Sequence, residues 1–396
     1  MPRFHVASER EILEGKTTDV YFERTRKILE AEGLTGRRVL AEVTVGSLPD
    51  GWRWAVLCGV EEVARLFEGK PVNVYSLPEG TIFTPADSTG IRVPVMLVEG
   101  AYYDFCVYET PLLGFLCQAS GIATKAARIR KLAGGSLLVS FGIRRMHPAV
   151  APMIDRAAYI GGFDAVSCPA GAETIGERPV GTMPHALVIL FGDAASAARA
   201  FDRHVEAEAP RIVLVDTFLD EKTEALRVAE ALGGKLYGVR LDTPSSRRGN
   251  FAEIVREVRW ELNLRGYSHV KIFVSGGIEE AKIPGLVEAG VEGFGVGTSL
   301  SNAPTVDFAL DIVEVEGKPI AKRGKLAGRK SLWRCWKCMV DLVAPAGRPQ
   351  PSCPKCGGKM ESMLKPLVLE GKLARDLPKP SEIRKYVLSQ LGRVEV

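Results

Sequence analysis

The chain has 396 residues, of which 46% are hydrophobic, and this is enough for two or three domains with cores of their own. The formal net charge is +4, from 52 basic and 48 acidic residues spread along the chain without a long basic run, which argues against nucleic acid as the main partner. No stretch approaches the roughly 18 uninterrupted apolar residues of a membrane span, and the segment MPRFHVASER has no apolar signal core, so we expect a cytoplasmic protein without a membrane partner.

The first hundred residues predict a layered α/β domain. Residues 17–33 have the periodicity of an amphipathic helix, and residues 38–45 and 93–102 form short alternating runs typical of strands. A further helix ends at Gly69, and a long helix is predicted over residues 109–135. Helices and strands mixed in this way usually pack in layers.

From residue 136 the pattern changes to short apolar runs that alternate with amphipathic helices. Their continuous Val, Leu and Ile content fits strands buried on both faces of a parallel sheet. Six or seven such strands, against eight in a standard barrel, predict a β/α barrel, although an open doubly wound sheet would give the same rhythm. The runs are residues 136–142, 163–169, 186–192, 211–218, 235–243, 269–277 and 292–300.

Polar, charged or glycine-rich residues follow five of these runs. In a parallel barrel the carboxyl ends of all strands meet at one mouth, so these residues favour the barrel and place a site there. Glycine and aspartate also end strands for purely local reasons, which is the alternative for any single motif. The residues concerned are Arg144 and Arg145, Asp216 and Thr217, Arg240 and Asp242, residues 275–277, and residues 295–298.

Two glycine motifs, residues 274–278 and 295–300, lie at the ends of successive late strands, where barrel enzymes commonly bind phosphate. Glycine lets the main chain approach an anion closely, so that N–H groups can point at phosphate oxygens. Tight turns without a ligand are the alternative. The predicted phosphate-binding residues are Gly276, Gly277, Gly297 and Thr298.

Charged groups accompany the glycine motifs. Asp216 and Asp242 could hold ribose hydroxyls or a magnesium ion, and Arg240 could bind a carboxylate or a diphosphate, unless they only pair with each other at the rim. Arg144 and Arg145 add two cations, too many for simple rim pairing. His185 follows a Gly-Thr turn, and its role as base, ligand, phosphate carrier or structural residue stays open at this point.

The last part of the chain departs from the barrel rhythm. Residues 306–323 predict an antiparallel hairpin about Glu316 and Gly317, and residues 381–391 predict a closing helix. Two Cys-X-X-Cys pairs separated by fourteen residues have the spacing of a tetrahedral zinc site, and four protein thiolates would make that zinc structural. Iron is the minority alternative. The predicted ligands are Cys335, Cys338, Cys353 and Cys356.

An ordered series of motifs resembles nicotinate phosphoribosyltransferase, a type II phosphoribosyltransferase related in fold to quinolinate phosphoribosyltransferase. The series covers residues 8–300 and includes TTDVYFERT, LPEGTIFTPAD, FGIRRMHP, GTMPHAL, VDTF, GVRLDT, SGGI and GVGTSL. The resemblance implies an α/β fold with an N-terminal sandwich, an irregular barrel with fewer than eight strands, and a dimer, or a higher assembly of dimers, with active sites at the subunit interface. The resulting division is residues 1–110 joined by 301–325, the catalytic barrel 111–300, and the zinc ribbon with the C-terminal helix 326–396.

The resemblance also implies roles for residues that match the family motifs. Arg240 would bind the nicotinate carboxylate, and the two glycine motifs would bind the 5-phosphate of phosphoribosyl diphosphate. Mg²⁺ would accompany phosphoribosyl diphosphate, and ATP would phosphorylate His185. Catalysis would thus involve His185, Arg240, Asp216 and Asp242. The nicotinate pocket would comprise Tyr21 from the partner subunit, Phe141, Arg144, Arg145 and Thr182.

One departure from the family pattern concerns the segment after Arg240. Relatives commonly read Asp-Ser-Gly-Asp where this chain has Asp242-Thr-Pro-Ser, so a second acidic group is missing at that corner. The expected reaction is ATP-coupled nicotinate phosphoribosyl transfer in NAD synthesis or salvage. The rival acceptors are nicotinamide and quinolinate, and a rival of another class is a zinc-ribbon binding protein on an inactive barrel.

Overall fold

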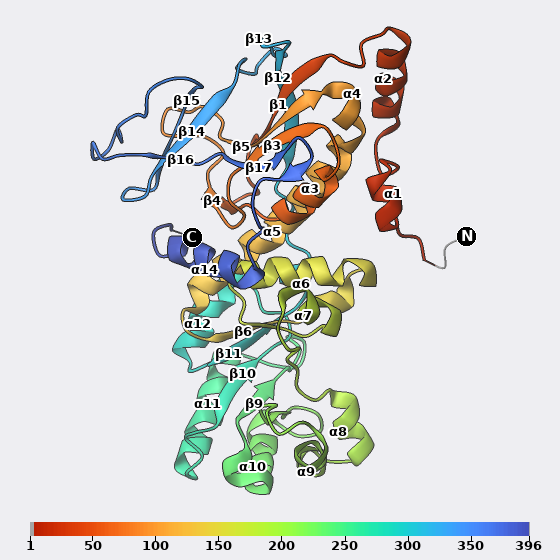
Figure 1. Ribbon diagram of the computed structural model, residues 1–396. Coiled ribbons are helices and arrows are strands. Elements are labelled where there is room, and N and C mark those ends of the chain that lie inside the picture. Colours follow the sequence, from red (N-terminus) through yellow and green to blue (C-terminus); the bar gives the residue numbers. More distant parts are fainter. Residues whose placement is uncertain (1–3, 396) are drawn as a thin grey trace. The chain divides into compact units, whose positions relative to one another are not determined.

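The computed structural model describes residues 4–395 and divides the chain into two compact units. Unit 1 combines residues 1–124 with residues 304–396, and unit 2 comprises residues 125–303. Each unit has its own main sheet (Figure 1). Within the described residues, the structure contains no helix that is long and apolar enough to cross a membrane.

The main sheet of unit 1 has seven antiparallel strands in the order β13-β12-β1-β5-β3-β17-β18. Strands from the last third of the chain therefore flank strands from the first hundred residues on both sides. The predicted hairpin is confirmed, because Val315 of β12 pairs with Lys318 of β13. The strands are β1 (Arg38–Val45), β3 (Val72–Ser76), β5 (Pro94–Ala101), β12 (Phe308–Val315), β13 (Lys318–Pro319), β17 (Lys365–Leu369) and β18 (Lys372–Leu373).

The core of unit 1 forms where one face of this sheet meets helices. Alternate residues of β1, such as Val39, Ala41 and Val43, join a large apolar cluster with residues of α3 and α5, while Leu40 packs on the opposite face. A short pair of strands, β2 (Ala55–Val56) and β4 (Ile82–Phe83), completes this layer. The helices are α1 (Glu9–Leu13), α2 (Val20–Ala31), α3 (Val60–Phe67), α4 (Tyr102–Phe105), α5 (Glu109–Ala133) and α14 (Pro380–Leu391), with the 3-10 turn η1 (Cys106–Tyr108).

A separate three-stranded sheet with the order β15-β14-β16 carries the four cysteines, with Cys335 at the end of β14 and the other three in the connecting turns. Buried polar contacts join this small sheet to the rest of unit 1: Lys330 Nζ lies 2.7 Å from Glu42 Oε2, and Asp87 Oδ2 accepts a hydrogen bond from the Val343 N–H. The basic segment 322–330 therefore ends in a lysine that is anchored to unit 1. The strands are β14 (Lys330–Cys335), β15 (Val340–Pro345) and β16 (Glu361–Ser362).

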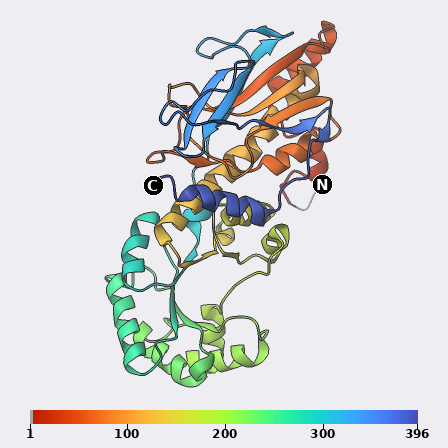
Figure 2. The ribbon, with the colours of Figure 1, turned by 60° about the vertical axis from the view of Figure 1, so that its left-hand side comes forward.

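The sheet of unit 2 has six parallel strands in the order β7-β6-β11-β10-β9-β8. The predicted α/β fold with fewer than eight barrel strands is confirmed. Figures 1 and 2 show the curled sheet with helices along its outer side. The strands are β6 (Leu137–Ser140), β7 (Ala165–Val166), β8 (Ile212–Leu214), β9 (Gly238–Leu241), β10 (Lys271–Val274) and β11 (Gly293–Val296).

One predicted strand of unit 2 is wrong. Residues 186–191 lie in helix α8 (His185–Phe191), and Gly192 caps its C-terminus in a left-handed conformation. A continuous run of six apolar residues fits a buried strand or a helix equally well, and here Leu190 stays 83% exposed. The other helices are α6 (Ala151–Ile160), α7 (Pro169–Ile175), α9 (Ala194–His204), α10 (Glu221–Leu232), α11 (Phe251–Leu264), α12 (Ile283–Glu288) and α13 (Thr298–Ser301), with 3-10 turns η2 (Ile143–Arg145), η3 (Pro148–Val150), η4 (Gly233–Lys235) and η5 (Glu280–Lys282).

Candidate active site

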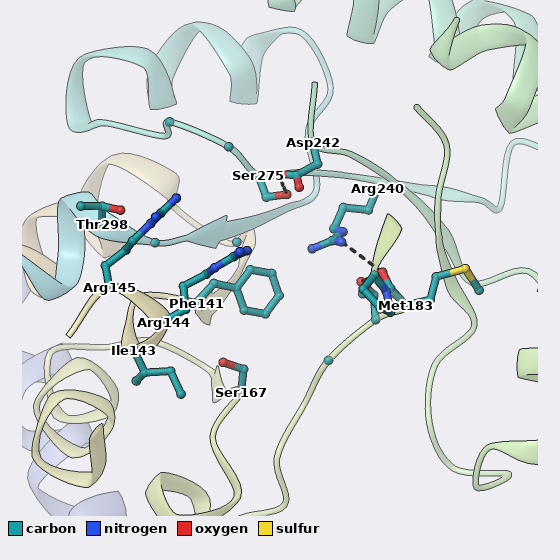
Figure 3. A pocket seen from close by; sticks show the side chains of 17 residues that line it. Phe141, Ile143, Arg144, Arg145, Ser167, Met183, Arg240, Asp242, Ser275 and Thr298 are labelled. Carbon is teal, nitrogen blue, oxygen red and sulfur yellow. Dashed lines mark hydrogen bonds between the residues drawn. The ribbon is translucent and has the colours of Figure 1, made fainter. Parts of the chain in front are cut away.

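A cavity of about 610 Å³ opens where the carboxyl ends of the parallel strands of unit 2 converge. Figure 3 shows Arg144 and Arg145 extending from one side of it and Arg240 from another, with Phe141 between them. The lining residues are Phe141, Ile143, Arg144, Arg145, Ser167, Gly181, Thr182, Met183, Pro184, Arg240, Asp242, Ser275, Gly276, Gly277, Gly295, Gly297 and Thr298.

One end of the cavity combines an aromatic ring with a cation. The Arg240 guanidinium carbon lies 5.7 Å from the centre of the Phe141 ring, and Arg240 Nη2 donates a hydrogen bond to the Met183 carbonyl at 3.2 Å. Burial lowers the pKa of Arg240, and its Nε has no partner among residues 4–395. Such an end can stack a flat aromatic ligand and bind a carboxylate on it.

Gly295 makes room for this arrangement. A Cβ atom at residue 295 would lie 2.4 Å from two ring carbons of Phe141, so any side chain there would displace the ring. The backbone also fixes Phe141, because its N–H donates to the Val296 carbonyl at 2.8 Å. The aromatic end therefore depends on a glycine in the neighbouring strand β11.

The other end of the cavity is formed by the two glycine-rich turns. Gly276 and Gly277 have φ angles of 79° and 67°, the left-handed region that glycine adopts without a steric penalty. Gly297 and Thr298 lie at the start of the second turn, and the exposed side chains of Arg144 and Arg145 lie on the same cavity. Main-chain N–H groups and guanidinium groups together suit a phosphate or diphosphate ligand.

Two aspartates border the cavity through a short hydrogen-bond network. Asp242 Oδ1 accepts a hydrogen bond from Ser275 Oγ at 2.7 Å. Asp216 Oδ2 accepts from the Asp242 N–H at 2.7 Å and lies 2.8 Å from Thr243 Oγ1, whereas Asp216 Oδ1 is buried without a hydrogen-bond partner in the described part of the chain. Burial raises the pKa of Asp216, although these hydrogen bonds and His185 lower it in part.

His185 lies beside these aspartates at the first residue of α8. Its Nε2 is 3.7 Å from Asp242 Oδ2 and 3.9 Å from Asp216 Oδ1, and its Nδ1 is 3.1 Å from Thr217 Oγ1. The side chain is 40% exposed, so a ligand can reach it. The contact at Nδ1 leaves Nε2 facing the two carboxylates.

The structure brings most of the predicted site residues of unit 2 to one cavity. His185 and Asp216 do not line the cavity but contact Asp242, which does. Tyr21 lies in unit 1, 56% exposed on α2, and is not among the lining residues. The predicted residues that line the cavity are Phe141, Arg144, Arg145, Thr182, Arg240, Asp242, Gly276, Gly277, Gly297 and Thr298.

Sequence reasoning assigned no individual role to several lining residues. Ser275 directly precedes Gly276, and Met183 and Pro184 stand between Thr182 and His185, so their neighbours in the sequence pointed to them. Ile143, Gly181 and Gly295 also lie inside or beside quoted motifs. Ser167 had no such signal, because it reaches the cavity only through the end of β7.

The four cysteine sulfurs of the ribbon lie within 4.8 Å of one another. Cys335 Sγ and Cys356 Sγ are 3.7 Å apart, close to the roughly 3.8 Å expected between two thiolates on a tetrahedral zinc with Zn–S bonds of about 2.3 Å. The donor set therefore fits a metal ion. All eight cysteines are free thiols in the structure.

Comparisons with known proteins agree with this arrangement. Residues 19–120 match the family model of the N-terminal domain of quinolinate phosphoribosyl transferase, and residues 122–311 match that of its C-terminal domain. The chain is 31% identical over 382 residues to nicotinate phosphoribosyltransferase pncB1 of Mycobacterium tuberculosis, covering 85% of this chain and 82% of the relative. Nicotinate phosphoribosyltransferase of Bacillus subtilis is 31% identical over 281 residues, 66% of this chain and 54% of that protein.

Solved structures give the same relationship. The structure described as nicotinate-nucleotide pyrophosphorylase from Pyrococcus furiosus is 59% identical, covers 100% of both chains and superposes with a TM-score of 0.95. Human nicotinic acid phosphoribosyltransferase shares the fold, with a TM-score of 0.76 at 22% identity over 96% of this chain and 94% of the human one.

The fold and the cavity define a type II phosphoribosyltransferase. Within that class, the extent of the match to the mycobacterial relative shows that the chain belongs to the nicotinate phosphoribosyltransferase family of enzymes. The resemblance recognised from the sequence motifs is thereby confirmed.

Proposed function

We propose that this enzyme transfers the phosphoribosyl group of phosphoribosyl diphosphate to nicotinate, in NAD biosynthesis or salvage. The nicotinate ring nitrogen attacks the anomeric carbon, the bond from that carbon to diphosphate breaks, and nicotinate mononucleotide and diphosphate result. The observation that carries the proposal is a single cavity with a cation beside an aromatic ring at one end and two glycine-rich turns at the other. No general base is needed, because the pyridine nitrogen already carries a lone pair at neutral pH.

At the acceptor end, we assign the nicotinate carboxylate to Arg240 and the ring to Phe141. The unpartnered Nε and the partial burial of Arg240 support this role, since a guanidinium shielded from water binds a carboxylate strongly. Thr182 lines the same cavity and would contact nicotinate. Tyr21 would reach the site of a partner subunit, which requires a homodimer or a higher assembly of dimers; light scattering of the purified enzyme tests this.

At the donor end, we assign the 5-phosphate to Gly276, Gly277, Gly297 and Thr298. Arg144 and Arg145 would neutralise the departing diphosphate, because charge on the leaving group grows as the anomeric carbon gains oxocarbenium character. Asp216 and Asp242 fit a magnesium ion that accompanies the diphosphate, since Asp216 offers a buried oxygen without a hydrogen-bond partner among residues 4–395. Magnesium would shield the phosphate charges.

The acceptor distinguishes the rivals. Nicotinamide lacks the carboxylate that Arg240 would bind, and quinolinate carries two carboxylates and would require more cations at the aromatic end. Steady-state rates of nucleotide formation with nicotinate, nicotinamide and quinolinate, each with and without ATP, test the proposal. We expect nicotinate to be used with the highest kcat/KM; comparable turnover of nicotinamide, or higher turnover of quinolinate, would contradict the assignment.

We propose that ATP hydrolysis is coupled to the transfer through a phosphohistidine at His185. Its exposed ring and its position beside Asp242 support this role. Mass spectrometry after incubation with ATP should find a phosphoryl group on His185, and His185→Ala should abolish the stimulation of turnover by ATP. His204→Ala, at an exposed histidine on α9, is the matched control and should keep the stimulation. An unmodified His185, with the ATP effect intact in His185→Ala, would sink this role.

For the ribbon we propose a structural zinc held by Cys335, Cys338, Cys353 and Cys356. The four thiolates would fill all tetrahedral positions and stabilise a segment whose own apolar cluster is small. Metal analysis of the freshly purified enzyme should give about one equivalent of zinc. A content below about half an equivalent, or iron in its place, would contradict the zinc assignment.

A further inference from the structure

Two cations hold the main-chain carbonyls of the first glycine-rich turn. Arg248 Nη2 donates to the Gly276 carbonyl at 3.5 Å, and Lys282 Nζ donates to the Gly277 carbonyl at 3.0 Å. Arg248 precedes the turn in the sequence and lies just before α11, whereas Lys282 follows the turn and lies in η5. Neither residue lines the cavity, and no sequence motif pointed to them.

Arg248 is held in place by an aromatic ring against one face and by hydrogen bonds from its Nη atoms. Its guanidinium carbon lies 3.7 Å from the centre of the Phe251 ring, and Phe251 is only 8% exposed. Its Nη1 donates a hydrogen bond to the Thr243 carbonyl. The guanidinium therefore joins the segment after β9 to the glycine turn after β10. Lys282 is 45% exposed and also lies 3.9 Å from Glu279.

Peptide geometry links these carbonyls to the opposite side of the turn. In a trans peptide the C=O of one residue and the N–H of the next point in opposite directions, and the described residues contain no cis peptide bond. A Gly276 carbonyl directed at Arg248 therefore turns the Gly277 N–H away from Arg248. In the same way, a Gly277 carbonyl directed at Lys282 turns the Ile278 N–H away from Lys282.

The N–H groups of this turn are available to a ligand. Within residues 4–395, no main-chain acceptor is paired with the N–H groups of Gly276, Gly277 or Ile278. Gly276 and Gly277 line the cavity, so an anion in it meets the N–H groups of these two residues, and the Ile278 N–H follows them in the same turn. A carbonyl rotated into the cavity would instead repel a phosphate, because its oxygen carries partial negative charge.

We propose that Arg248 and Lys282 are positioning residues for phosphate binding, which act by holding the Gly276 and Gly277 carbonyls so that the adjoining N–H groups face the phosphate. This inference rests on the proposed role of the glycine turn in binding the 5-phosphate. It predicts that loss of either cation weakens the binding of phosphoribosyl diphosphate but not the binding of nicotinate.

The first test compares Michaelis constants of Arg248→Met and Lys282→Met with those of the wild-type enzyme. We expect the KM for phosphoribosyl diphosphate to rise about fivefold in Arg248→Met and about tenfold in Lys282→Met, since a hydrogen bond from a charged group is lost in each. The KM for nicotinate should stay within about twofold. Arg248→Lys and Lys282→Arg, which keep a cation, should recover part of the loss.

Arg247→Met is the matched control. Arg247 is the exposed neighbour of Arg248, and the change removes the same charge from the same segment without touching the glycine carbonyls. Its KM for phosphoribosyl diphosphate should stay near the wild-type value. An equal rise in Arg247→Met would mean that net charge alone acts, and a parallel rise in the KM for nicotinate would indicate general disruption; either result overturns the proposal.

The second test needs no turnover and uses inorganic phosphate as the probe. In the whole enzyme, the amide resonances of Gly277 and Ile278 should shift on addition of phosphate, and the apparent Kd should weaken in both methionine variants but not in Arg247→Met. If the wild type forms no product, yet phosphate binding weakens in both methionine variants, the positioning role of Arg248 and Lys282 is supported and the proposed function is contradicted. If product forms and phosphate binds equally to the wild type and all variants, the proposed function is supported and the positioning role of Arg248 and Lys282 is contradicted.

Discussion

Buried charges are treated differently in the two units of this protein. In unit 1, Arg334 is 2% exposed and donates to both carboxylate oxygens of Asp341 at 2.7 Å, with a third contact to Gln390. In the cavity of unit 2, the partly buried Arg240 has one hydrogen bond, to a carbonyl, and an Nε without a partner among residues 4–395.

This difference separates charges that serve folding from charges that serve binding. An unpaired charge in the protein interior lowers the stability of the folded state. Asp341 pairs with Arg334 and so removes this penalty. Arg240 Nε can donate a hydrogen bond, and Asp216 Oδ1 can accept one. Neither atom has a hydrogen-bond partner among residues 4–395. Unused capacity of this kind is typical of ligand sites.

The largest expected effect is on stability, in Arg334→Met. Asp341 would then be left buried without its cation, and we expect the free energy of unfolding to fall by about 3–5 kcal/mol. Chemical denaturation followed by fluorescence measures this. The double variant Arg334→Met with Asp341→Leu removes both charges and should regain most of the loss. Equal losses in the single and double variants would mean that packing, not pairing, holds the ribbon.

The next effect is on activity, in Arg240→Met. We expect kcat/KM for nicotinate to fall by about 100-fold, because a charge-assisted contact to the carboxylate is lost at a partly buried position. The free energy of unfolding should stay unchanged or rise, since the substitution removes a partly buried cation whose Nε has no partner among residues 4–395. A stability loss as large as that of Arg334→Met would show that the two arginines serve the same purpose.

The smallest effect concerns Asp155, a fully buried carboxyl of α6 that accepts a hydrogen bond from Ser140 Oγ at 2.7 Å. Burial raises its pKa from 3.8 to about 6, although hydrogen bonds from Ser140 and the Cys168 main chain lower it in part. The folded state therefore binds the proton more tightly than the unfolded state. The resulting stabilisation is fully present below about pH 4 and is lost as the pH rises through about 6.

Asp155→Asn removes this titration. The wild type should lose on the order of 2 kcal/mol relative to Asp155→Asn between about pH 4 and pH 7, measured by denaturation at several pH values. Stability curves that run parallel over this range would show that Asp155 does not change its protonation on folding.

The sequence predicted elements best where local patterns were strong. Residues 38–45 form β1, residues 109–133 form most of the predicted long helix, and the hairpin at Glu316 and Gly317 forms because both residues adopt positive φ angles. It failed at residues 186–192, where α8 leaves Ile189 and Leu190 exposed. Whether such an apolar run forms a strand or a helix depends on the residues that pack against it, and the local sequence pattern carries no information about them.

The candidate site was predictable where chemistry and backbone freedom coincide. Gly276 and Gly277 lie at positive φ beside the cavity, as their motif suggested, and Arg240 lies at the end of a strand that opens on it. Arg248 and Lys282 were not predictable, because they act on carbonyls 28 and 5 residues away in the chain. The place of Tyr21 in a site stays a prediction.

The sequence alone thus determined the α/β class, the parallel strand rhythm, the four-cysteine cluster and the family, because periodicity, spacing and ordered motifs are local properties of a chain. The tertiary structure decided which of these residues share one cavity, which buried charges are paired, and which carbonyls are held. These three features depend on contacts between residues that are distant in sequence, such as Lys330 with Glu42 and Asp216 with Asp242. Such contacts exist only after the sheets have formed.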